Sequence, residues 1–97
     1  MVSDPVRLVS AKWRYLGAQR LGADGVNEAT LPAGATIVVI TAETGAIRYK
    51  INGTADANST PVPQDQTRVI GPLANLDGFS VFNSGGSVAY LEFYREA

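Results

Sequence analysis

The 97-residue chain contains neither cysteine nor histidine. Without cysteine there are no disulfides, no thiolate metal ligands and no thiol nucleophiles. Without histidine the chain lacks the commonest general base and one of the commonest metal ligands. Most hydrolase chemistry is therefore out of reach. We expect a binding or structural protein that is not an enzyme and that needs no cofactor.

The chain is also too short for a second independent core. We therefore predict a single domain over residues 1–97. A domain of this size buries only about 60 to 65% of its unfolded surface, and no disulfide adds to its stability. Association with copies of itself or with a larger partner would bury additional apolar area. We accordingly expect an oligomer.

Long apolar runs are missing as well. The run Ile37–Ile40 is far too short to span a bilayer. Residues 1–5 lack the basic and apolar parts of a secretory signal. We expect a soluble, unexported protein with no membrane partner.

The net charge of −1 argues against direct nucleic-acid binding, which normally depends on a basic surface. The charges are nevertheless unevenly distributed. Residues 1–20 carry four basic side chains and one acidic side chain, whereas the rest of the chain carries four basic and eight acidic ones. Two interpretations are open. One is ordinary scatter on a solvated face, and the other is a docking arm or strand within residues 1–20 that seeks an acidic partner.

Apolar residues recur at period two in short runs that are separated by Gly, Pro, Asn and Asp, a pattern typical of β-sandwiches and barrels. Residues 6–16 and 46–52 alternate in this way. Residues 35–41 are too apolar to alternate, so we expect that strand to be buried on both faces. The pattern predicts an all-β fold with seven to eight short strands. We expect an antiparallel β-sandwich of the jelly-roll or immunoglobulin-like kind.

The segments between these strands are rich in turn residues. Residues 16–25 contain three glycines and an Asp-Gly pair, and they predict a loop. Residues 53–66 are polar and contain two prolines, which exclude a central strand and predict a second loop. We expect a helical turn at residues 73–76. The paired glycines of residues 83–86 predict a hairpin between the last two strands.

The acidic residues offer one candidate cation site. Asp56, Asn58 and Asp65 supply the oxygen ligands that calcium prefers, but the spacing of an EF-hand and its terminal glutamate are missing. A solvated loop is the simpler interpretation. We therefore predict no metal site.

The aromatic residues mostly fall in expected strands, where such side chains usually belong to the core. Trp13 and Tyr15 differ, because they stand beside Lys12 and Arg14, and a mixture of Trp, Tyr and Arg is typical of protein-interface hot spots. Core packing and stacking on single-stranded nucleic acid are the competing interpretations, and the acidic remainder of the chain disfavours the second. The predicted protein-interface residues are Arg7, Lys12, Trp13, Arg14 and Tyr15.

The second half of the chain resembles a known group of proteins in four segments, residues 47–56, 71–72, 77–82 and 88–95. An Arg-Tyr-x-Ile-Asn-Gly strand leads into a Thr- and Pro-rich loop, and the last strand closes on an aromatic-Arg pair, Tyr94-Arg95. This combination is similar to that of small tailed-bacteriophage virion proteins of the capsid decoration, or cement, type. The resemblance covers roughly residues 35–95 and does not extend to residues 1–34.

The resemblance implies a non-enzymatic protein on the outer capsid surface of the virion, assembled in the host cytoplasm. Such proteins commonly form homotrimers that contact the major capsid protein and stabilise the head by bridging capsid subunits. Two alternatives stay open. The first is a head-to-tail or tail-tip module of the virion. The second is a carbohydrate- or cell-surface-binding β-sandwich that uses the loop over residues 53–66 and exposed tyrosines.

Overall fold

The computed structural model describes residues 13–73, 76 and 78–96. These residues form eight strands and no helix, which confirms the all-β prediction, and none of them lies in a helix of the length and hydropathy needed to cross a membrane. The strands are β1 (Trp13–Leu21), β2 (Gly25–Glu28), β3 (Ile37–Thr44), β4 (Ile47–Lys50), β5 (Thr60–Val62), β6 (Thr67–Ile70), β7 (Ser80–Asn83) and β8 (Val88–Glu96).

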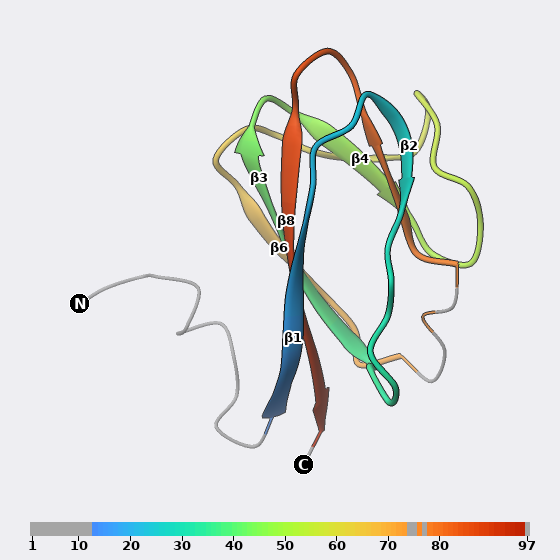
Figure 1. Ribbon diagram of the computed structural model, residues 1–97, viewed down its shortest axis with the longest axis vertical. Helices are drawn as coiled ribbons and strands as arrows, with labels where there is room; N and C mark the ends of the chain where they lie inside the picture. The colour runs from blue at the N-terminus through green and yellow to red at the C-terminus, as the bar shows by residue number, and fades with distance from the viewer. Residues whose placement is uncertain (1–12, 74–75, 77, 97) are drawn as a thin grey trace.

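The strands are arranged in two four-stranded antiparallel sheets (Figure 1). Sheet A has the order β1-β8-β3-β6, and sheet B has the order β2-β7-β4-β5. The central hairpin β4–β5 is followed outward along the chain by the pairs β3–β6, β2–β7 and β1–β8. The chain is thus one long antiparallel ribbon wound into two sheets. This is the strand order of a jelly roll, and it differs from the immunoglobulin-like alternative.

One buried cluster draws apolar side chains from both sheets, an arrangement compatible with a β-sandwich. Val38 and Phe93 enter it from sheet A, and Ile47 and Val81 enter it from sheet B. Phe79, directly before β7, is fully buried in the same cluster. Burial of each such side chain contributes about 1.5 to 3 kcal/mol relative to its exposure. This cluster is therefore the main source of stability.

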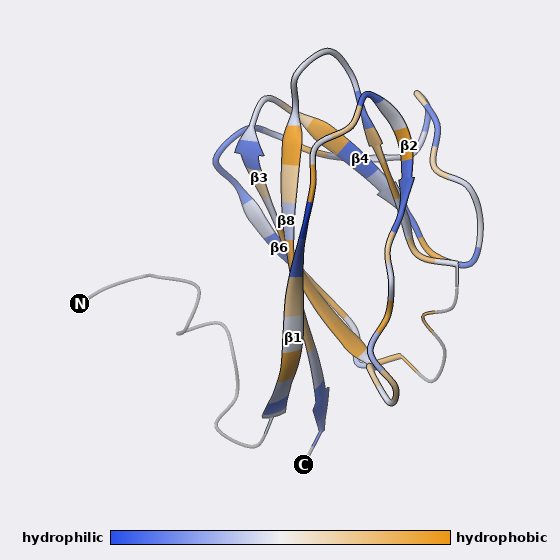
Figure 2. Cartoon of the chain, viewed as in Figure 1, coloured by the Kyte–Doolittle hydropathy of each residue, from blue (hydrophilic) through white to orange (hydrophobic). Residues whose placement is uncertain are grey.

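Strand β3 is buried on both faces, as its continuous apolar run predicts. Val38 and Ile40 belong to the cluster between the sheets, whereas Ile37 and Val39 belong to a second cluster that also contains Tyr94. In Figure 2 the lower half of β3 is accordingly coloured as hydrophobic. Because neighbouring residues of a strand point to opposite faces, the second cluster lies on the outer face of sheet A.

Strand β1 contradicts the prediction of a loop over residues 16–25. It continues to Leu21, and its pairing with β8 resumes at Gly17 after a register shift. Gly17 has a φ of 150°, which glycine adopts readily, so this glycine marks a β-bulge and not the end of a strand. Leu16 and Leu21 both contact the cluster between the sheets. Tertiary packing therefore overrides the local turn signal.

The predicted hairpin over residues 83–86 is also wrong. Strand β7 pairs with β2 and β4 in sheet B, whereas β8 pairs with β1 and β3 in sheet A. The connection between them passes from one sheet to the other. Gly85 and Gly86 have φ values of 55° and 84°, which a hairpin turn would also require. The two kinds of connection therefore look alike in the sequence.

A buried amide holds this crossing in place. Asn83 is 1% exposed, and its side-chain amide donates to the carbonyl oxygens of Leu21 at 3.0 Å and Ala23 at 3.2 Å. The N–H of Gly86 donates to the carboxylate of Asp24 at 3.0 Å. The connection after β7 is therefore tied to the loop after β1.

The remaining predicted segments have mixed outcomes. The stretch over residues 53–66, predicted as one loop, contains β5. This strand lies at the edge of sheet B, a position that tolerates Pro61. A turn at residues 32–34 leads into β3, with the N–H of Ala35 donating to the carbonyl oxygen of Pro32 at 3.1 Å. Residues 6–12 of the first expected strand, and part of the helical turn expected at residues 73–76, lie outside the described residues.

Candidate functional site

Three of the five predicted interface residues begin strand β1. Trp13, Arg14 and Tyr15 lie at one end of this edge strand, next to the C-terminal end of β8. In Figure 1 the two strand ends run together to the bottom of the molecule. Residues 13–15 and 94–96 are called the β1–β8 tip below. Arg7 and Lys12 lie outside the described residues.

The β1–β8 tip has two chemically different faces. Its cross-strand pairs are Trp13 with Glu96, Arg14 with Arg95 and Tyr15 with Tyr94. Paired residues point to the same face of a sheet, and successive residues point to opposite faces. The aromatic side chains therefore share one face, and the two arginines share the other.

The aromatic face is built around Tyr94. The ring centroid of Tyr94 lies 5.6 Å from that of Tyr15 in an edge arrangement and 6.1 Å from that of Trp13. Tyr94 is only 8% exposed, whereas Tyr15 is 56% exposed. Burial raises the pKa of Tyr94 above its ordinary value, and the negative charge of Glu92 adds to this effect. Tyr94 thus has the core role expected for most aromatics, and Tyr15 presents an accessible ring.

The basic face places two exposed like charges directly opposite each other. Arg14 and Arg95 are cross-strand partners, and such pairs are destabilising in an antiparallel sheet. A Cβ atom added to Gly34 would lie 3.7 Å from Cδ of Arg95, so the Arg95 side chain runs close to the turn at Gly34. Among the described residues, no carboxylate forms an ion pair with either arginine. The described part of the chain thus leaves the charge of this face without an opposite partner.

The second arginine of β1 is already paired within the chain. Arg20 donates from Nε to Oε1 of Glu43 at 2.6 Å and from a terminal nitrogen to Oε2 at 3.1 Å. Its guanidinium carbon also lies 5.5 Å from the ring centroid of Tyr90. The hydrogen bond from Arg20 lowers the pKa of Glu43, and the same bond raises the pKa of Arg20. This end of β1 offers a partner no comparable charge.

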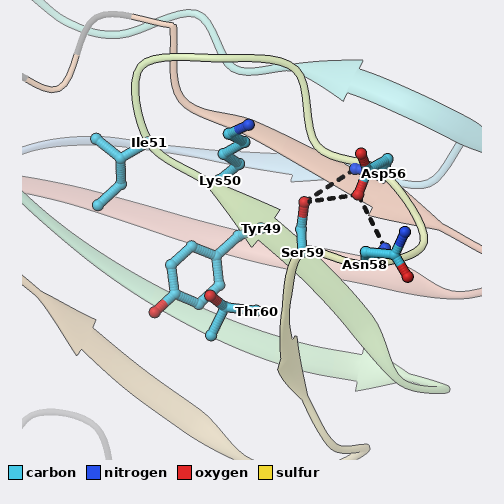
Figure 3. A pocket seen from close by; sticks show the side chains of 7 residues that line it. All are labelled: Tyr49, Lys50, Ile51, Asp56, Asn58, Ser59 and Thr60. Atoms are coloured by element: carbon cyan, nitrogen blue, oxygen red, sulfur yellow. Dashed lines mark hydrogen bonds between the residues drawn. The ribbon is translucent and has the colours of Figure 1, made fainter.

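The loop after β4 borders a shallow cleft of about 460 Å³ (Figure 3). Within the loop, Oδ1 of Asp56 accepts hydrogen bonds from the N–H of Asn58 at 2.8 Å and from Oγ of Ser59 at 3.3 Å. Ser59 Oγ accepts in turn from the N–H of Asp56 at 3.0 Å. The residues that line the cleft are Tyr49, Lys50, Ile51, Asp56, Asn58, Ser59 and Thr60.

Of the three candidate calcium ligands, Asp56 and Asn58 line this cleft and Asp65 does not. Asp56 serves its own turn, a common use of Asp in loops. The N–H of Asp65 instead donates to the carbonyl oxygen of Ala42 at 2.8 Å, and Asp65 does not line the cleft. Within the described part of the chain, no group of three or more acidic side chains is placed to hold a metal ion.

Ser80, a residue that the sequence analysis did not select, fixes the start of this loop. It is 1% exposed, and its hydroxyl accepts from the N–H of Ala55 at 2.6 Å while donating to the carbonyl oxygen of Gly53 at 2.8 Å. Arg48 adds a bond of 2.8 Å to the carbonyl oxygen of Ser59. A single serine in an apolar strand gives no sequence signal for such a role, because it resembles an ordinary surface position.

The β1–β8 tip was also incompletely identified from the sequence. The aromatic-Arg pair Tyr94-Arg95 was noted as part of the family resemblance, but nothing indicated that it would lie opposite Arg14 and Tyr15. Comparisons with protein-family models, curated proteins and solved structures give no match to this chain. The resemblance to phage decoration proteins, the partner and the location therefore stay predictions.

Proposed function

We propose that this protein is a non-enzymatic virion protein that binds the outer capsid surface of a phage and stabilises the head by bridging subunits of the major capsid protein. The β1–β8 tip is the observation that supports this most. It presents exposed Tyr15 and Arg14 beside Trp13, and residues of these types dominate the binding energy of protein interfaces. The position of β1 at the edge of sheet A also supports the proposal, because another chain can approach an edge strand from the side.

The fold is consistent with this role without requiring it. Jelly rolls occur in viral capsid proteins and also in lectins and cupins, so the architecture alone does not set the function. The family resemblance of the second half favours the first of these uses. The exposed aromatic and basic residues at one end of the molecule suit a protein whose task is to adhere to another protein.

A homotrimer on the virion surface is part of the proposal. Three copies held together would present three β1–β8 tips to neighbouring capsid subunits. Linked contacts of this kind bind far more tightly than each contact alone. The partner is thus the major capsid protein, with no direct contact to nucleic acid and no membrane partner.

The test uses heads assembled without this protein from the major capsid protein of the same genome. The mass of the purified protein is measured by sedimentation, and its binding to the heads is measured by co-sedimentation. We expect a trimer that saturates the heads at a fixed stoichiometry and raises the temperature at which they release DNA. A monomer that leaves the heads unoccupied would contradict the proposal.

The cleft beside β4 favours one alternative, a carbohydrate-binding β-sandwich. It combines the ring of Tyr49 with the charged groups of Lys50 and Asp56, and its loop is already ordered by its own hydrogen bonds. A sugar needs an apolar surface with a few fixed polar groups. Binding to a glycan panel that is lost in Asn58→Ala would support this alternative, and a silent panel would remove it.

A further inference from the structure

We propose that the β1–β8 tip binds an extended segment of the partner protein in which acidic and apolar residues alternate, and that this segment pairs with the outer edge of β1. The inference rests on the proposed function for the partner's identity, the major capsid protein. The mode of binding and the chemistry of the segment come from the geometry of the tip. Three independent features carry it.

The first feature is the edge itself. The two sheets have four edge strands, of which β1 has nine residues, β2 and β6 have four each and β5 has three. Strand β5 also contains Pro61, which suits an edge but cannot donate a backbone hydrogen bond. Strand β1 contains no proline, and no strand of the described residues pairs with its outer side. It is the edge best able to accept an added strand through main-chain hydrogen bonds.

The second feature is the pair Arg14 and Arg95. A carboxylate that reaches over the face shared by the two guanidinium groups would be attracted by both and would offset their repulsion, and Arg-carboxylate bonds are frequently bidentate. A phosphate backbone would offer the same charge. The opposite, aromatic face of β8, however, carries Glu92 and, within the tip itself, Glu96, and the net charge of the chain is −1. An acidic peptide therefore fits this surface better than a nucleic acid.

The third feature is the separation of the two faces. A strand added to β1 would direct every second side chain to the face of Tyr15 and the others to the face of Arg14. Apolar side chains suit the first face, because the ring of Tyr15 is exposed beside Trp13 and Tyr94. Acidic side chains suit the second. The geometry thus specifies an alternating pattern and not merely an acidic composition.

The experiment uses the full-length protein and two synthetic ten-residue probes, one with alternating Glu and Val and one with the same residues in two blocks. Binding is measured by fluorescence anisotropy at low salt. We expect the alternating peptide to bind at least tenfold more tightly than the block peptide. We expect R14E and R95E each to weaken that binding by tenfold or more, and the exposed Lys50→Glu on sheet B to leave it unchanged.

Thermal unfolding of the variants separates binding from folding. R14E places opposite charges across the β1–β8 pair, so the free protein should unfold at the same or a higher temperature while its binding is lost. No binding of the alternating peptide, equal binding of the two peptides, or binding that is insensitive to both arginine variants would overturn the inference.

The same variants are then tested with undecorated heads. If heads bind R14E, R95E and the unaltered protein equally, the acidic-segment inference fails and the proposed function stands. If the alternating peptide binds in an arginine-dependent way but heads do not bind at all, the proposed function fails and the binding mode stands.

Discussion

The two ends of the wound ribbon are the hairpin β4–β5 and the pair β1–β8. They differ in how far their polar and charged groups are paired within the chain. The pair β4–β5 has three registered residue pairs, contains Pro61 and continues into a loop that Ser80 and Arg48 hold by hydrogen bonds. The pair β1–β8 has eight registered pairs, yet it ends in an exposed Tyr15 and in two opposed arginines. At the first end, hydrogen bonds within the chain hold the loop in place. The second end presents groups that suit a partner.

Strand β1 repeats this contrast on a smaller scale. Arg20 is bound by both oxygens of Glu43, whereas Arg14 faces the like charge of Arg95. Both arginines belong to the same strand. Their different surroundings show that the charge at the β1–β8 tip is a local feature of β1, which no carboxylate of the described residues compensates.

The largest expected effect comes from removing the inner anchor of β8. Phe93→Ala should lower the free energy of unfolding by about 3 to 5 kcal/mol, because it opens a cavity between the sheets. Urea unfolding followed by tryptophan fluorescence measures this. Phe82→Ala is the matched control, since Phe82 is only half-buried and should cost less. An equal effect of the two changes would contradict the packing described.

A smaller loss of stability is expected from Ser80→Ala, and it should be confined to the β4–β5 end. Ser80→Ala leaves the N–H of Ala55 and the carbonyl oxygen of Gly53 without their shared partner. Unsatisfied buried groups of this kind cost about 1 to 3 kcal/mol. Hydrogen exchange should become faster over residues 53–60 and stay unchanged over residues 13–21. Faster exchange at both ends would show that the two ends are not independent.

Reversing one charge at the β1–β8 tip should stabilise the protein, in contrast to the two changes above. R14E converts a like-charge cross-strand pair into an opposite-charge pair, so the free energy of unfolding should rise by roughly 0.2 to 1 kcal/mol. Chemical denaturation at low salt measures the change, which should shrink at high salt. A clear loss of stability would mean that Arg14 has a structural role, and the comparison of the two ends would then fail.

The smallest effect concerns the exposed pair Arg20–Glu43. The hydrogen bond from Arg20 lowers the pKa of Glu43, so the pair stabilises the fold above the carboxyl's unfolded pKa and loses that contribution as pH falls through its folded pKa. An NMR titration should give a pKa for Glu43 below its ordinary value. In Arg20→Gln it should return to that value. An unchanged pKa in the variant would remove Arg20 as the cause.

Local patterns predicted much of the fold but not its long-range pairing. The alternation over residues 46–52 and the apolar run at β3 correctly indicated strands, because each strand's burial leaves a pattern in its own residues. The pairing of β1 with β8 joins the two ends of the chain and leaves no such pattern. The hairpin error has the same origin, since Gly85 and Gly86 suit a turn within one sheet or a crossing between two.

The candidate site was likewise predicted only in part from the sequence. The mixture of Trp13, Arg14 and Tyr15 was visible in the sequence as an interface signal. The contribution of Arg95 depends on register, which no local pattern reveals. The anchoring roles of Ser80 and Asn83 depend on burial at positions where polar residues usually face solvent.

Hydrogen exchange of the protein alone and bound to undecorated heads is the most direct test of the central claim, that the β1–β8 tip is the binding surface and the β4–β5 end is not. Sites that become slower on binding report the interface. We predict slower exchange over residues 13–21 and 88–96 and unchanged exchange over residues 47–62. Protection confined to residues 47–62 would contradict the account and assign binding to the opposite end of the ribbon.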